Sequence, residues 1–267
     1  MGQRWPWKET ASCRSVMQQP FIGGCLNLFA MKKGVQRYYQ KRAETYEDLD
    51  EPETIVAAVR AIGIADHLRI MDLGKEELVL DVGCGTGRFL QPFSSRARAV
   101  GVDFTVEMLE KAGESGALLV RADAEHLPFK DRVFDVVHSA GLLGVYRSQR
   151  ICHEMVRVAG KGGRVYVSFP ASESASGVVA RLFMRLGWNP TLLDHWYSKA
   201  DIRGMLPVEA EITGIYRLGF EPPFQRLYRH LRSRLLTRLF IALERKLRDR
   251  PLLRYFGARW LVEAKRG

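Results

Sequence analysis

Several features that define other classes of protein are missing from this chain of 267 residues. No run of 18 apolar residues occurs, so we predict no transmembrane helix. The motif G-x-x-x-x-G-K-[ST] is also absent, which excludes a P-loop. The four cysteines, Cys13, Cys25, Cys84 and Cys152, show neither metal-ligand spacing nor a disulfide framework. We therefore expect a reduced, cytoplasmic protein with no bound metal.

Acidic residues are scarce at both ends of the chain. Residues 1–42 carry eight Lys or Arg against one acidic residue, and residues 221–267 carry thirteen against four. The segment between them has twenty basic and twenty-five acidic residues, although the formal net charge of the whole chain is +11. An enzyme that acts on nucleic acid is expected to spread basic charge through its catalytic core. Nucleic acid is therefore a weaker candidate partner than a small molecule.

The first thirty residues have no sustained helical or strand period and mix Trp, Pro, Gly and Cys. Met31 then begins a segment typical of an ordinary cytosolic start. We expect 1–30 to be a disordered extension or a mis-assigned start, and 31–267 to form the one folded domain. A targeting leader is the alternative, because FIGGCLNLFAM is apolar. This run spans only 11 residues, however, and no convincing cleavage site follows it.

From residue 32 the pattern alternates between helices and strands with continuous apolar runs. Short βαβ repeats of this kind predict an α/β fold, in which helices cover both faces of a parallel sheet. The expected strands are 77–82, 97–104, 117–123, 133–140 and 164–170, with two more near 209–217 and 258–265. The expected helices are 33–48, 53–71, 87–95, 105–112, 147–158, 175–187 and 198–205.

Three glycines alternate in LVLDVGCGTGRFL (78–90), directly behind the first expected strand. Glycine costs backbone entropy, so such a loop requires positive φ angles or the close approach of a neighbour. At this place in a parallel sheet the loop lies in a ligand-binding crevice. The dinucleotide motif G-x-G-x-x-G/A fits poorly, because its last position is Arg88 and the third glycine, Gly87, comes one residue early.

The glycine loop has the form D-x-G-x-G-x-G and starts at Asp81. Asp103 ends the second strand 22 residues later, and the segments RADAEHLPF, FDVVHSAGLL and GKGGRVYVS follow in that order. Together these segments resemble class I S-adenosylmethionine-dependent methyltransferases. Within the class they resemble the methyltransferase-11 group, typified by ubiquinone and menaquinone biosynthesis methyltransferases. The resemblance implies a Rossmann-like sheet of seven strands, mostly parallel, with the last strand antiparallel.

S-adenosyl-L-methionine is the cofactor that the resemblance implies. Glycines let backbone groups approach its methionine end, and a helix N-terminus favours its carboxylate. Asp103 would accept ribose hydroxyls, and Asp123 would contact the adenine; a helix cap and a turn are their simpler alternatives. Tyr46 belongs to a helix that covers the cofactor in the family, or else packs on the sheet. The full set implied for cofactor contact is Tyr46, Asp81, Gly83, Gly85, Thr86, Gly87, Asp103, Phe104, Met108, Asp123, Ala124 and Ser139.

Methyl transfer needs little side-chain chemistry, because the sulfonium already activates the carbon that is attacked. Aligning a nucleophile about 3 Å away can supply on the order of 7–11 kcal/mol. A base is needed only to deprotonate an oxygen or nitrogen acceptor. The candidates are His195 and Tyr197, in the DHWYS segment where acceptors enter in the family, and His138 near the end of the fourth strand. Packing in the core or in an aromatic cluster is the alternative for each.

A long basic helix is expected within 224–250, inserted before the last strand. Apolar residues recur there with a helical period, and basic residues fill much of the rest. Three interpretations stay open: a helix docked over the acceptor site, a peripheral contact with anionic membrane, and a contact with nucleic acid. The apolar positions are Phe224, Leu227, Tyr228, Leu231, Leu235, Leu239, Leu243 and Leu247.

Three functions are compatible with these residues. The first is methyl transfer to a small-molecule or lipid-like acceptor of quinone or prenyl type. The second is a tRNA or rRNA methyltransferase that uses the basic termini, and the third is a non-catalytic protein that binds the cofactor. The loop after the fourth strand reads SAGL, unlike the Asn/Asp-Pro-Pro-Tyr/Phe loop typical of amino-directed base methylation, and no Pro-Cys pair offers a nucleophile for a pyrimidine carbon. These observations favour the first function.

Overall fold

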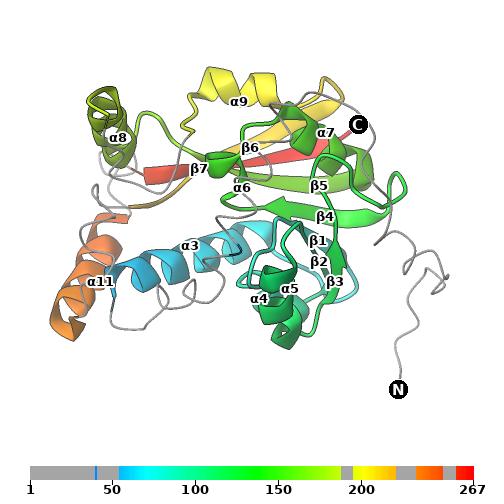
Figure 1. Cartoon of the computed structure of the whole chain (residues 1–267), viewed down its shortest axis with the longest axis horizontal. Helices are drawn as coiled ribbons and strands as arrows, with labels where there is room; N and C mark the ends of the chain where they lie inside the picture. The colour runs from blue at the N-terminus through cyan, green and yellow to red at the C-terminus, as the bar shows by residue number, and fades with distance from the viewer. Residues whose placement is uncertain (1–39, 41–53, 188–194, 221–232, 249–256) are drawn as a thin grey trace.

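A computed structural model describes residues 40, 54–187, 195–220, 233–248 and 257–267. In this part of the chain seven strands form one sheet, in the order β3-β2-β1-β4-β5-β7-β6 (Figure 1). The strands are β1 (Leu78–Val82), β2 (Arg98–Asp103), β3 (Leu118–Arg121), β4 (Phe134–Ser139), β5 (Ala159–Pro170), β6 (Ala210–Phe220) and β7 (Gly257–Arg266). The helices are α3 (Ile55–Met71), α4 (Leu90–Ser94), α5 (Val106–Ala112), the 3-10 helix η3 (Gly113–Ser115), α6 (Leu142–Val145), α7 (Gln149–Val158), α8 (Ala175–Arg185), α9 (Lys199–Met205) and α11 (Arg234–Arg248).

The strand pairing confirms a mostly parallel sheet with an antiparallel last strand. β1 pairs in parallel with both β2 and β4, whereas β7 runs antiparallel to β5 and β6. The chain builds the sheet outward from β1 to β3 and then crosses back to place β4 on the other side of β1. In open α/β sheets ligands bind outside the carboxyl ends of the strands at such a reversal. The topology therefore directs attention to the loops behind β1 and β4.

Helices cover both faces of the sheet, as predicted. Met155 of α7 and Ile202 of α9 belong to one core cluster, and Met71 of α3, Phe93 of α4 and Ala112 of α5 belong to the other. Figure 1 shows α3, α4 and α5 on the opposite side of the sheet from α7 and α9. All five residues of β1 are buried, which explains its continuous apolar run.

Local differences from the predicted elements have identifiable causes. β5 starts at Ala159, five residues early, because Ala159 pairs with Phe134 before the register shifts and Arg164 pairs with Val136. The helix predicted at 87–95 starts only at Leu90, because the glycine loop extends almost to it. The four-residue helix α6 was not predicted.

Some predictions fall on residues outside the described ranges. These are the extension at 1–30 and, except for Gln40, the helix at 33–48. Of the basic helix predicted within 224–250, the structure describes α11. No described helix is both long enough and apolar enough to span a membrane.

Candidate functional site

The loop behind β1 is held in a conformation that glycine adopts most readily. Gly83, Gly85 and Gly87 have φ angles of 74°, 55° and 85°. A Cβ atom on Gly83 would lie 3.1 Å from Leu142 of α6, and one on Gly87 would lie 3.1 Å from the backbone of Ala112 in α5. A Cβ atom on Gly85 would meet no atom within 4 Å. Two glycines therefore let the loop pack against helices, and the third leaves room for a ligand.

One carboxylate ties this loop to the tip of β2. Asp103 Oδ2 accepts the backbone N–H of Gly85 (3.0 Å), and its Oδ1 accepts the backbone N–H of Thr105 (2.8 Å). Burial raises the pKa of Asp103, and these two hydrogen bonds oppose that shift. The N–H of Gly83 also donates to the carbonyl of Val102 (2.8 Å). The loop and the end of β2 thus form one hydrogen-bonded unit.

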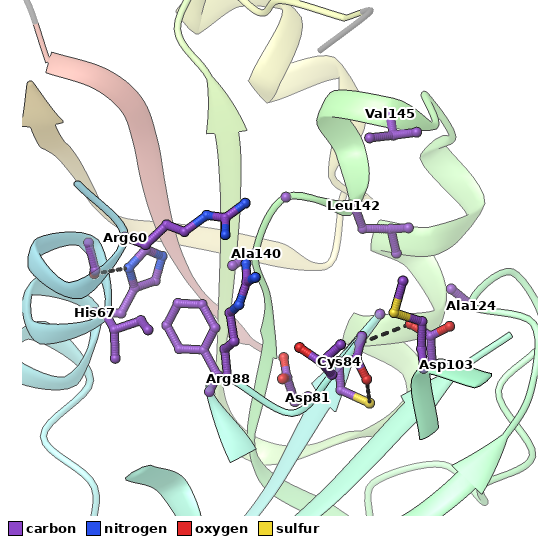
Figure 2. Close-up of a pocket in the computed structure, with 18 of the residues that line it drawn as sticks. Arg60, His67, Asp81, Cys84, Arg88, Asp103, Ala124, Ala140, Leu142 and Val145 are labelled. Atoms are coloured by element: carbon purple, nitrogen blue, oxygen red, sulfur yellow. Dashed lines mark hydrogen bonds between the residues drawn. The ribbon is translucent and has the colours of Figure 1, made fainter. Parts of the chain in front are cut away.

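A pocket with a volume of about 320 Å³ opens over the loop. Asp103, Asp123 and Ala124 line one part, which we call the aspartate end. Arg60, His67 and Arg259 line another part, which we call the α3 end. Figure 2 shows Asp103 and Ala124 on the opposite side of this space from Arg60 and His67. The crevice expected at the strand ends therefore has two chemically different regions.

Most residues implied for cofactor contact line this pocket, and two do not. Gly87 packs against α5 instead, and the buried hydroxyl of Ser139 donates to the carbonyl of Val82 (2.8 Å). Tyr46 lies outside the described residues. Those that line the pocket are Asp81, Gly83, Gly85, Thr86, Asp103, Phe104, Met108, Asp123 and Ala124.

Asp81 lines the pocket and is paired with a histidine of the adjacent strand. The register of β1 and β4 sets Asp81 beside His138, and His138 Nδ1 donates to Asp81 Oδ1 (2.8 Å). His138 is fully buried and is not one of the pocket-lining residues. This geometry supports a role in orienting the Asp81 carboxylate, and the catalytic role of His138 stays a prediction.

The other two predicted catalytic residues do not line this pocket. Tyr197 is fully buried, and its hydroxyl donates to the carbonyl of Leu143 (2.9 Å). Its ring contacts Phe169 edge-on, with the ring centroids 5.1 Å apart, and burial raises its pKa. This matches the alternative of a packed aromatic residue. His195 lines a second hollow of about 420 Å³, together with Arg147, Arg181, Met184, Arg185 and Trp196.

The α3 end is the part of the site that sequence reasoning missed. Arg88 from the glycine loop and Arg259 from β7 add positive charge to it. Figure 2 shows Arg60 and Arg88 extending toward the same space beside Ala140. The available signal was the helical spacing of both apolar and polar residues along α3, which places them on one stripe. The α3 residues that line the pocket are Val56, Val59, Arg60, Gly63, Ile64 and His67.

His67 lines this end of the pocket and carries a ring nitrogen without a hydrogen-bond partner. Its Nδ1 lies 2.7 Å from the carbonyl oxygen of Gly63, so Nδ1 must carry the proton. Nε2 is buried without a hydrogen-bond partner. Burial, the neighbouring His138 and the positive charge of Arg259 lower the pKa of His67 to about 3. The imidazole is therefore neutral at physiological pH, and its buried Nε2 is unprotonated.

The fold and the site together define an S-adenosylmethionine-dependent methyltransferase. The family model described as a methyltransferase domain matches residues 80–167, which run from β1 into β5. The chain is 33% identical over 181 residues to demethylmenaquinone methyltransferase of Thermobifida fusca, a match that spans 57% of this chain and 75% of the relative. The chain therefore belongs to the family of S-adenosylmethionine-dependent methyltransferases that this family model describes, and its cofactor is S-adenosyl-L-methionine.

Two further similarities differ in how much of the other protein they include. The human protein named probable tRNA methyltransferase 9B is 29% identical over 131 residues, which is 48% of this chain but only 29% of that relative. Magnesium protoporphyrin IX methyltransferase from Synechocystis, solved with bound SAH, superposes with a TM-score of 0.62 at 16% identity. That match spans 88% of this chain and all of the other, and it establishes the shared fold. The described residues contain no cluster of three or more side chains able to hold a metal ion.

Proposed function

We propose that the chain transfers the methyl group of S-adenosyl-L-methionine to a small, lipid-like acceptor of quinone or prenyl type. The observation that carries this proposal is the continuation of the cofactor pocket along α3, where Val56, Val59 and Ile64 offer apolar surface. An acceptor bound there lies beside the cofactor, between these aliphatic side chains and the positively charged Arg60, Arg88 and Arg259. The similarity to demethylmenaquinone methyltransferase supports this class of acceptor.

In this proposal the aspartate end binds the nucleoside part of the cofactor. Asp103 accepts the ribose hydroxyls, and the open side of Gly85 lets the backbone approach the methionine part. The methyl group then points toward the α3 end. Transfer proceeds by in-line displacement, in which the acceptor atom bonds to the methyl carbon as its bond to sulfur breaks. Alignment supplies most of the acceleration.

His67 orients the acceptor in this proposal. Its unprotonated Nε2 accepts a hydrogen bond from an acceptor hydroxyl. With a pKa of about 3 it is a weak base, so it aligns the hydroxyl, and the hydroxyl proton leaves to water as the oxygen–methyl bond forms. His138, His195 and Tyr197 are not needed for this step, since none of them lines the pocket.

RNA methylation is the second candidate function. The second hollow carries Arg147, Arg181 and Arg185 beside Trp196. Arginines bind backbone phosphates, and an aromatic ring stacks with bases. The partial similarity to a probable tRNA methyltransferase points the same way.

Label transfer separates the two candidates. Purified protein is incubated with methyl-labelled S-adenosylmethionine and an extract of the source cells, and the products are partitioned into organic, RNA, protein and small-molecule fractions. We expect label in the organic fraction, lost with Asp103→Ala and retained with the surface control Asp131→Ala. Label confined to RNA would contradict the lipid-like acceptor and support the second candidate. Label in no fraction would contradict both.

A further inference from the structure

The exposed large apolar side chains are concentrated on two helices. Ten such side chains occur in the part of the chain that the structure describes, and seven of them belong to α8, its C-terminal cap and α11. Both helices lie at the same end of the molecule, at the left in Figure 1. Exposed apolar side chains that gather in one part of a molecule mark an interaction site. The seven residues are Val178, Leu182, Leu186, Leu235, Leu236, Leu239 and Leu243.

Helix α11 turns its apolar row outward. Leu235, Leu239 and Leu243 recur every four residues and are 67%, 57% and 51% exposed. Thr237 and Glu244, by contrast, are each only 5% exposed. This reverses the usual burial of an amphipathic helix, in which the apolar stripe faces the core. The sequence period predicted the helix correctly, and α11 packs against α3, but its row of leucines faces away from the protein.

Helix α8 repeats this arrangement. Val178, Leu182 and Leu186 recur every four residues and are 51%, 57% and 74% exposed, while Ala180 on the same helix is fully buried. The row continues into Leu186, the residue that caps the helix. Two helices at one end of the molecule thus each present a row of three exposed aliphatic side chains.

The charge that accompanies these rows has one sign. Helix α8 contains Arg181 and Arg185 and no acidic residue. The acidic residue of α11 is Glu244, which is buried. The exposed basic residues of α11 are Arg234, Arg238, Arg245 and Lys246. Leucines interleaved with arginines are the composition of a helix that lies in the interface of an anionic bilayer.

The position of α11 connects this surface to the proposed acceptor site. α11 packs against α3, and residues of α3 line the pocket. We propose that α8 and α11 form a membrane-docking face that binds the surface of a bilayer containing anionic lipid. The leucines enter the boundary between headgroups and acyl chains, and the arginines contact lipid phosphates. This deepens and rests on the proposed lipid-like acceptor, because docking brings α3 and the pocket close to the lipid phase.

Flotation of the full chain with vesicles tests the docking face. Vesicles of phosphatidylcholine alone are compared with vesicles that also contain phosphatidylglycerol, at low and high salt. We expect binding only when phosphatidylglycerol is present and weaker binding at high salt. Each removed basic residue near the surface is expected to weaken binding about fivefold. Arg234→Gln combined with Arg238→Gln is the charge variant, and Lys161→Gln, exposed on β5, is its control.

The apolar part of the face has its own variant. Leu239→Gln combined with Leu243→Gln removes two exposed side chains, so the fold should tolerate it. Val208→Gln is the matched control, because Val208 is fully exposed and lies outside α8 and α11. We expect the double variant to lose at least tenfold in vesicle affinity and the control to match the original chain. No vesicle binding, or binding that the leucine variant leaves unchanged, would overturn the docking face.

Two other readouts separate this proposal from its alternatives. Sedimentation without lipid would reveal a dimer that depends on Leu239 and Leu243, and such a dimer without vesicle binding would assign the face to a second copy of the chain. The leucine variant should still bind S-adenosylmethionine and methylate a detergent-dispersed organic acceptor. If the original chain methylates the organic acceptor but does not bind vesicles, the docking face alone is overturned. If the original chain binds vesicles but places label only in RNA, the proposed acceptor is overturned.

Discussion

The two ends of the pocket are built in different ways. The aspartate end is made by backbone turns at the tips of adjacent parallel strands, where Asp103 accepts the N–H of Gly85. The α3 end is made by side chains such as His67 on a helix and Arg259 on the last strand, which are far apart in the sequence. Backbone turns can bind a cofactor that many related enzymes share, whereas side chains from distant elements can select a particular acceptor. Changes at the two ends should therefore have separable effects.

The largest effect is expected at the aspartate end. Asp103→Ala removes the hydrogen-bond acceptor that we propose for the ribose hydroxyls, together with the tie to Gly85. Two hydrogen bonds to a charged group contribute roughly 3 kcal/mol or more, so the Kd for S-adenosylmethionine should rise at least about 100-fold. Isothermal titration calorimetry measures this, with Asp131→Ala as the surface control. An unchanged Kd would contradict the assignment of this end.

A substitution in the glycine loop is expected to lower the stability of the fold. Gly87→Ala places a Cβ at φ 85° and 3.1 Å from the backbone of Ala112. We expect the free energy of unfolding to fall by about 2–3 kcal/mol, from the strained φ and the overpacking. Gly113→Ala is the control, because its φ is −55° and a Cβ there meets no atom within 4 Å. Urea unfolding of both variants tests the difference, and equal losses would count against the packing role of Gly87.

A pH dependence is expected at the α3 end. His67 has a pKa of about 3 when folded, below its ordinary value of 6.5, so the unfolded chain binds more protons between these values. The loss of folding stability caused by the low pKa of His67 is therefore small above pH 6.5 and grows as the pH falls toward 3. Between pH 7 and pH 5 the original chain should lose about 2 kcal/mol more stability than His67→Gln. Parallel urea titrations at the two pH values measure this, and identical losses would show that His67 protonates freely in the fold.

The smallest effect is expected at the second hollow. His195 lies outside the cofactor pocket, so His195→Ala should change the rate of methyl transfer to the organic fraction less than twofold. The label-transfer assay used for the proposed function checks this directly. A large loss would restore His195 as a catalytic residue and would move the acceptor site away from α3.

The contrast between the ends also explains what the sequence could predict. β1 was expected at 77–82 and spans Leu78–Val82, because its apolar run and the glycines behind it are local signals. The aspartate end followed from the same signals. The α3 end did not, because pairing a helix stripe with Arg259 of β7 requires the tertiary fold. The sequence also could not predict which face of α11 packs against the protein, because a helical period identifies the apolar face but not the face that is buried.

The most direct test of this account is a calorimetric titration of S-adenosylmethionine into Asp103→Ala and His67→Gln side by side. The account predicts that Asp103→Ala loses cofactor affinity at least about 100-fold, while His67→Gln stays within about twofold of the original chain. Equal losses in both variants would contradict the division of the pocket into a cofactor end and an acceptor end.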